Sequence, residues 1–147
     1  MLGYLLLAAT AGAMVAVQAG VNAQLSHWVG SPIRAAFVSF LIGTTALLLL
    51  AVVAVRKSFP SASRLGDAPW WIWIGGLLGA FYVAVAIVSA PKLGAATLIA
   101  AVVAGQTVAS VVVDQYGWVG FKEQHLTPGR ILGMVLVVSG VALVRYF

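Results

Sequence analysis

The sequence predicts an all-α integral membrane protein in which five helices cross the bilayer. Hydrophobic residues make up 63% of its 147 residues and charged residues only 7%, whereas soluble domains carry about 25% charged residues. A bilayer core of about 30 Å needs about 20 helical residues to cross it, and four stretches without Asp, Glu, Lys or Arg are long enough. These stretches are residues 1–33, 35–55, 68–91 and 93–113.

A fifth, shorter stretch, residues 131–144, lies between Arg130 and Arg145. Long basic side chains at both ends of a helix can extend toward the lipid headgroups and so complete the span. Segments with the short alternation of a β-barrel strand are not found in the sequence. Because five is an odd number of crossings, the two termini are predicted to lie on opposite sides of the membrane.

Turn-forming residues separate the apolar stretches and set the predicted helix boundaries. All five prolines lie at these boundaries, as expected for residues that break helices. Ser31 followed by Pro32 is typical of an N-cap and a first helical position, so residues 26–32 are predicted to form the first turn. The single predicted domain, residues 1–147, has helices at about residues 2–25, 32–55, 69–90, 93–115 and 128–146.

The basic residues lie near the helix ends, where membrane topology places them. The face that bears the N-terminus is predicted to carry Arg56, Lys57, Arg64, Lys122 and Arg130, and the other face Arg34, Lys92 and Arg145. An excess of Lys and Arg marks the cytoplasmic face, but a difference of five against three is weak and permits insertion in both orientations. The net charge of +5 does not indicate nucleic-acid binding, because the sequence has no basic stripe with interleaved aromatic residues.

Missing residue patterns exclude several classes of protein. Cysteine is absent, which excludes disulfides, thiol catalysis and thiolate metal sites. The sequence has no nucleotide-binding motif, no nucleophile–base pair and no cluster of metal ligands, and His27 and His125 fall in separate predicted loops. We therefore expect no enzyme activity, no metal and no cofactor.

Ordered motifs along nearly the whole chain carry a resemblance to a known family. The motifs are QAGVNAQL at residues 18–25, GSP at 30–32, AFVSFLIGT at 36–44, WIWIGGLLG at 71–79, PKLGAAT at 91–97, Gly105-Gln106 with Ser110 and Asp114, and EQHLTPGRILGMVLVVSGV at 123–141. Together they resemble the YdcZ-type family of inner-membrane exporters, and the final stretch is similar to the closing helix of the wider drug/metabolite transporter (DMT) superfamily.

The resemblance implies a multi-pass protein of the bacterial inner (cytoplasmic) membrane and a DMT-type half unit of five helices. Ten-helix members of the superfamily resemble two such units fused as an inverted repeat. We therefore expect an antiparallel homodimer with dual topology, built from copies inserted in both directions; a parallel dimer and a heterodimer with a paralogue are the alternatives. In small members of the superfamily a glycine pattern on the last helix joins the protomers, which implies that role for Gly133 and Gly140.

Polar side chains within the predicted spans are candidates for contact with a substrate, because polar groups are costly in lipid and often mark functional sites. Gln18 and Asn22 are four residues apart and share a helix face, and Gln106 and Ser110 repeat this spacing. The predicted substrate-binding residues are Gln18, Asn22, Ser39, Tyr82, Gln106 and Ser110. These candidates also have structural alternatives. The amides could instead form hydrogen bonds between helices, and the hydroxyls of Ser39, Thr44 and Thr45 could bond to carbonyl groups of their own helix. Tyr82 could serve in packing alone.

Asp114 is the single carboxylate within a predicted span. The helix dipole disfavours a negative charge in the last turn, so we expect a basic partner, either Arg56 or Arg130. The alternative role for Asp114 is proton or cation coupling. Small multidrug exporters of the superfamily use a mid-membrane glutamate in their first helix, and because this chain has none, a simple glutamate-based exchange of protons for drugs is not expected.

The leading functional hypothesis is a secondary transporter that exports a small organic molecule by alternating access, without ATP. The alternatives are a small dimeric ion channel and a non-transporting membrane subunit that scaffolds a partner. The expected partners are the lipid membrane, the small-molecule substrate and a second copy of the chain, and nucleic acid is not expected.

Overall fold

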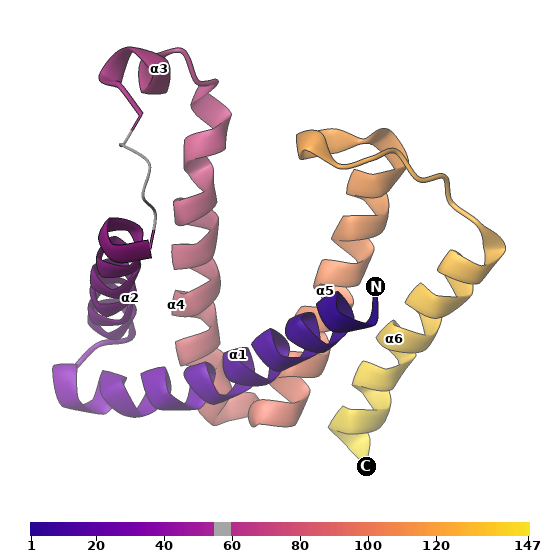
Figure 1. Ribbon diagram of the computed structural model, residues 1–147. Helices are drawn as coiled ribbons and strands as arrows, with labels where there is room; N and C mark the ends of the chain where they lie inside the picture. The colour runs from indigo at the N-terminus through magenta and orange to yellow at the C-terminus, as the bar shows by residue number, and fades with distance from the viewer. Residues whose placement is uncertain (55–59) are drawn as a thin grey trace. The chain divides into compact units, whose positions relative to one another are not determined.

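The computed structural model describes residues 1–54 and 60–147, and the chain is helical through most of these ranges (Figure 1). Within them, five helical segments are long and apolar enough to cross a membrane, which confirms the predicted all-α class and the number of spans. These segments are α1 (Leu2–Val29), α2 (Pro32–Ala54), η1 with α4 (Trp70–Leu93), α5 (Ala95–Tyr116) and α6 (Pro128–Tyr146).

Three short elements lie near the connections. They are α3 (Ala62–Gly66), the 3-10 helix η1 (Trp70–Ile74), which leads directly into α4 (Gly75–Leu93), and the 3-10 turn η2 (Trp118–Gly120). The predicted end of the second helix at Val55 lies outside the described residues, as do Arg56 and Lys57. Arg56 as a partner of Asp114 therefore stays a prediction.

The first helix is longer than predicted. It continues through Ser26 and His27 to Val29, so the predicted end at residue 25 and the predicted turn from residue 26 are wrong. The Ser26 hydroxyl donates to the Ala23 carbonyl at 2.7 Å, which satisfies this polar side chain within the helix. The helix ends instead at Gly30, whose φ of 75° is a left-handed conformation that glycine adopts at little cost.

The third span also continues past its predicted end. Pro91 was predicted to follow the helix, but it lies inside the last turn of α4, which ends at Leu93. A proline near the end of a helix removes few backbone hydrogen bonds, so the helix tolerates it there. The break to α5 comes at Gly94, whose φ of 76° and ψ of 162° are accessible essentially to glycine alone.

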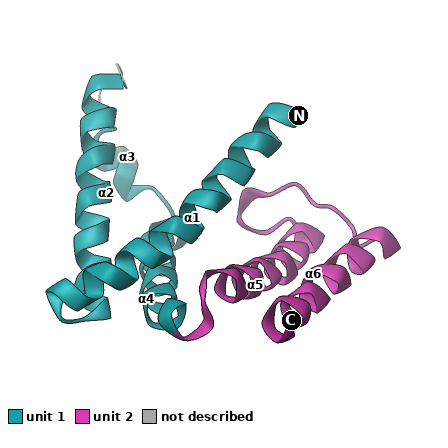
Figure 2. Cartoon of the chain, turned by 90° about the horizontal axis from the view of Figure 1, so that it is seen from below, with its two compact units in different colours: residues 1–91 teal, residues 92–147 magenta. Residues whose placement is uncertain are grey.

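The chain divides into two compact units, residues 1–91 and residues 92–147, which Figure 2 shows in different colours. In the first unit a small apolar core lies where the C-terminal part of α1, the first turns of α2 and the second half of α4 meet. Ala35, Ala36, Val83 and Ile87 form this core, and Leu25, Val29 and Tyr82 pack against it. Alanines let α2 approach its neighbours closely, as is usual for membrane helices.

The second unit is a helical hairpin in which α5 and α6 contact each other along their lengths. Leu98 and Ala104 of α5 are buried, whereas α6 has no buried residue. Large apolar side chains such as Leu48, Phe81 and Leu136 are more than half exposed. Such exposure is unfavourable in water but acceptable in lipid, which is as apolar as a leucine side chain.

Candidate functional site

A groove between α1 and α2 brings polar side chains together at mid-span. It has a volume of about 200 Å³ and is open on one side. Its polar lining comes from Gln18, Ser39 and Thr44. The remaining lining residues are Phe40, Gly43 and Leu47. We call this site the Gln18 groove.

The Gln18 groove lies near the middle of the two helices that form it. With a rise of about 1.5 Å per residue, Gln18 is about 4 Å from the middle of α1, and Thr44 is within about 2 Å of the middle of α2. Ser39 lies about 6 Å from the same point of α2. Polar groups at this depth are costly unless they have a function or a partner.

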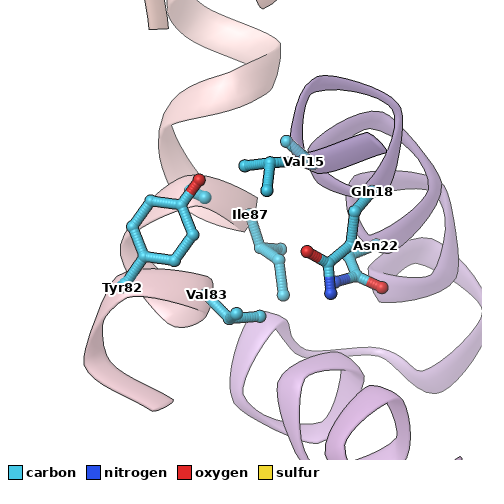
Figure 3. A pocket seen from close by; sticks show the side chains of 8 residues that line it. Val15, Gln18, Asn22, Tyr82, Val83 and Ile87 are labelled. Atoms are coloured by element: carbon cyan, nitrogen blue, oxygen red, sulfur yellow. The ribbon is translucent and has the colours of Figure 1, made fainter. Parts of the chain in front are cut away.

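Gln18 also borders a tightly packed cluster between α1 and α4. Figure 3 shows the side chains of Gln18 and Asn22 projecting from α1 toward Ile87 of α4, with the ring of Tyr82 on the α4 side. The cluster has no free volume for a water molecule. Asn22 is only 4% exposed, whereas Gln18 is exposed. Gln18 therefore lies between a cluster that has no space for a water molecule and a groove that has room for a small ligand.

The amide groups of this region have no hydrogen-bond partner in the chain itself. Within residues 1–54 and 60–147, neither Gln18 nor Asn22 forms a side-chain hydrogen bond. Gln18 is exposed, and within the described residues no fully buried side-chain nitrogen or oxygen is left without a partner, so both amides keep access to groups outside the chain. These two amides are therefore suited to a partner that comes from outside the single chain.

The hydroxyl groups of α2 fall into two classes. The Thr45 hydroxyl donates to the Leu41 carbonyl of its own helix at 2.9 Å, as one of the sequence alternatives predicted. Ser39 and Thr44 line the Gln18 groove, and over the described ranges of the chain neither hydroxyl forms a hydrogen bond. Thr44 was assigned from the sequence to bonding within its own helix, so its place in the groove adds a candidate residue.

The candidates on α5 belong to the second unit and are described separately. Gln106 is exposed and lies close to the middle of α5. The Ser110 hydroxyl is exposed too, but it donates to the Thr107 carbonyl at 2.9 Å, so its hydrogen is already engaged within the helix.

Gly133 is exposed and Gly140 partly exposed on α6, and a Cβ atom added at either position would meet no atom within 4 Å.

Asp114 forms an ion pair with Arg130, one of the two partners predicted for it. An Arg130 Nη2 atom donates to an Asp114 Oδ2 atom at 3.0 Å, and both side chains are partly buried. The same nitrogen donates to the Gln124 side-chain oxygen at 2.7 Å, and Nη1 donates to the Gln124 backbone carbonyl at 3.2 Å. Arg130 thus binds the end of α5 and the following loop at once.

Further hydrogen bonds fix this loop, residues 121–127. The backbone N–H of Gln124 donates to the Asp114 backbone carbonyl at 2.8 Å. The backbone N–H of Leu126 donates to the Gln115 side-chain oxygen at 2.7 Å. Thr127 caps α6 by accepting from the Arg130 amide at 3.3 Å. We call this network of residues 114–130 the α5–α6 clasp. Sequence reasoning missed its glutamines, whose side-chain oxygens accept hydrogen bonds from the Leu126 backbone and from Arg130.

In the part of the chain that the structure describes, neither His27 nor His125 belongs to a group of residues that could hold a metal ion, because no such group is found there. His27 lies in the last turn of α1, so its predicted place in a loop is wrong. His125 lies in the loop of the α5–α6 clasp, where its Nδ1 atom is 3.7 Å from a Glu123 carboxylate oxygen and 3.5 Å from the Gln115 side-chain nitrogen. The side chains of both His125 and Glu123 are more than half exposed.

Comparisons with known proteins place these helices in a family. A profile of the family described as "Putative inner membrane exporter, YdcZ" matches residues 3–143. The chain is also 29% identical over 135 residues to the protein named "Inner membrane protein YdcZ" of Escherichia coli (strain K12), across 91% of this chain and 89% of that protein. No solved structure matches the chain. Together with the five apolar helices, these matches identify a multi-pass inner membrane protein. The chain belongs to this YdcZ family of inner membrane proteins.

Proposed function

We propose that this protein is a secondary transporter that exports a small organic molecule by alternating access, as a homodimer of copies inserted in opposite orientations. The observation that carries the proposal is the Gln18 groove, which brings three polar side chains together with apolar ones at mid-span and is open on one side. Transporter binding sites commonly lie near the bilayer midplane, where two structural repeats meet. The family description as an exporter supports the same function.

The amides of the site support a role in binding rather than in holding the chain together. If Gln18 and Asn22 served only to join helices, hydrogen bonds from these amides to neighbouring helices would be expected. Neither forms one within residues 1–54 and 60–147. A substrate or a second copy of the chain would supply the missing partner.

An inverted second copy would complete the site. Inversion about an axis in the membrane plane moves the ends of each helix to the opposite side but leaves a residue at the midplane at the same depth. The groove residues of both copies would then lie at similar depths. The absence of any buried residue on α6, and the open space around Gly133 and Gly140, leave that helix available for contact with the second copy.

The energy source would be a gradient, or the protein would equilibrate its substrate, because the sequence has no nucleotide-binding motif. Asp114 is the one carboxylate within a span, but its oxygen is already bound to Arg130. A role in proton or cation coupling would require this ion pair to open during the transport cycle. The simpler assignment for Asp114 is the anchoring of the α5–α6 clasp.

The test is release from liposomes loaded with a defined panel of small neutral, cationic and anionic organic compounds, read out by mass spectrometry. The proposal predicts protein-dependent, saturable release of at least one class. Gln18→Leu should reduce this release at least tenfold without lowering the melting temperature, because leucine replaces an unpartnered amide. The matched control is Thr45→Val, which removes a hydroxyl that serves only its own helix and should leave release unchanged.

Two other results would contradict the proposal in different ways. Very fast, non-saturating and electrogenic flux would identify a channel. Absence of flux for every compound, from a folded and correctly inserted protein, would identify a non-transporting subunit.

A further inference from the structure

We propose that the Gln18 groove takes a neutral molecule, about the size of one aromatic ring, that carries hydrogen-bonding groups, rather than a cation or an anion. This inference rests on the proposed function, because it assigns the substrate class of the same site. Its basis is the combination of the groove volume, the lining chemistry and the positions of the charged residues in the described parts of α1, α2 and α4.

A cation would find no counter-charge in the groove. The whole chain has three carboxylates, Asp67, Asp114 and Glu123, and none belongs to α1, α2 or α4. Asp114 is paired with Arg130. The α1, α2 and α4 helices of a second copy also contain no carboxylate, so these helices would add no counter-charge to the groove.

The aromatic ring in the groove does not replace a carboxylate. Phe40 lines the groove and could attract a cation through its ring face. That attraction is smaller than the cost of moving an ion from water into a site of low polarity. The same ring face is suited to stack on a neutral aromatic group.

An anion would find no free cation in the groove. Arg34 is the basic residue of α2, and it lies in the first turn of that helix, five residues before Ser39. Its Nη1 atom donates to the Val29 carbonyl at 3.4 Å, which directs the guanidinium toward the end of α1. Lys92 lies in the last turn of α4, also at a helix end. Both positive charges are therefore at the ends of the spans and not at their middle.

The lining groups are those that a neutral polar molecule needs. The Gln18 amide can donate and accept hydrogen bonds, and the Ser39 and Thr44 hydroxyls can do both as well. None of the three is engaged within the described ranges, residues 1–54 and 60–147. The volume of about 200 Å³ lies below the range of pockets that hold drug-sized molecules, about 300–1,000 Å³, which favours a single-ring compound.

Three compounds of nearly equal shape test the inference, namely benzamide, which is neutral, benzamidinium, a cation, and benzoate, an anion. Binding is measured in detergent micelles by calorimetry on the full chain. Benzamide should bind at least tenfold more tightly than either ion. Gln18→Leu and Thr44→Val should each weaken benzamide binding at least threefold, whereas the neighbouring control Thr45→Val should not change it.

A designed charge provides a second test with a gain of binding. Ser39→Asp places a carboxylate in the groove and should strengthen benzamidinium binding at least tenfold while weakening that of benzamide. The melting temperature verifies that the variant is folded. If it is not, Thr44→Asp makes the same substitution five residues further along α2, on the same side of the groove.

The outcomes separate the inference from the proposed function. Equal or tighter binding of benzamidinium or benzoate by the unmodified protein, absence of benzamide binding, or unchanged selectivity in the folded Asp variants would overturn the inference. Saturable flux of charged compounds alone would also overturn it and would leave the proposed function intact. Benzamide binding without flux of any compound would instead contradict the proposed function.

Discussion

The polar side chains of the Gln18 region in the first unit and of the α5–α6 clasp in the second differ in whether they form hydrogen bonds within the chain. In the first unit, Gln18 and Asn22 lie well inside α1 and have no hydrogen-bond partner within the described residues, 1–54 and 60–147. In the second, Asp114 and Arg130 lie at helix ends and are bonded to each other and to the loop between them. Completed polar contacts hold a structure together, whereas incomplete ones at mid-span indicate a partner that is not part of the single chain. The comparison therefore assigns stability to the α5–α6 clasp and binding to the Gln18 groove, while Gln106, exposed near the middle of α5, stays a predicted binding residue of the second unit.

The largest expected effect on stability is the loss of the α5–α6 clasp. Arg130→Leu removes the ion pair and two further hydrogen bonds to the loop. Because hydrogen bonds to charged groups contribute about 1.5–3 kcal/mol, and because Asp114 would lose its partner, we expect a loss of about 3 kcal/mol. Thermal melting in detergent measures it. The control is Arg145→Leu on the same helix, and an equal loss in both variants would contradict the assignment.

A smaller effect is expected at the predicted dimer face of α6. Gly140→Leu adds a side chain whose Cβ atom has open space in the single chain, so the expected effect is on contact with another copy. We expect dimerisation to weaken at least tenfold, which corresponds to about 1.4 kcal/mol. Sedimentation equilibrium in detergent measures the change. Gly12→Leu, equally open on α1, is the matched control, and an unchanged dimer in the Gly140 variant would remove that residue from the interface.

The smallest effect is expected for Asp114→Asn, which removes the charge but keeps an oxygen that can accept a hydrogen bond from Arg130. We expect a loss of about 1 kcal/mol in stability, since a hydrogen bond that involves ionised groups is about twice as strong as a neutral one, which contributes about 1 kcal/mol. Substrate release from liposomes should be unchanged, with or without a pH gradient. If the variant instead stays stable but loses only its response to the gradient, Asp114 has the coupling role that the clasp assignment denies.

The five spans could be predicted because lipid imposes a simple rule. An uncharged stretch of 20 or more residues in a bilayer must satisfy its own backbone, and a helix does so. The errors occurred where local chemistry outweighs hydropathy. Ser26 and His27 resembled a turn but lie in the last turn of α1, and Pro91 resembled a helix end but lies inside α4. In both places the helix continues to a glycine with positive φ, Gly30 and Gly94.

The candidate site was only partly predictable. Helical spacing placed Gln18 and Asn22 on one face, the hydroxyl of Ser39 made it a candidate, and Tyr82 was a candidate because its ring could stack on a cationic or aromatic substrate. The sequence could not show that Gln18 separates a closed cluster from an open groove, because that depends on how α1 packs against α2 and α4. Nor could it distinguish Thr44 from Thr45, which differ by one position and therefore by about 100° around the helix. Which of the two threonines faces the groove depends on how α2 packs against α1.

The inverted pair is the central claim, and site-specific labelling tests it most directly. The chain has no cysteine, so His27→Cys and His125→Cys each introduce a single thiol at an exposed position. Five crossings place these two residues on opposite faces of the membrane. With a membrane-impermeant thiol reagent applied to intact spheroplasts, both variants should be labelled to comparable extents. Complete labelling of one variant and none of the other would show a single orientation and contradict the account.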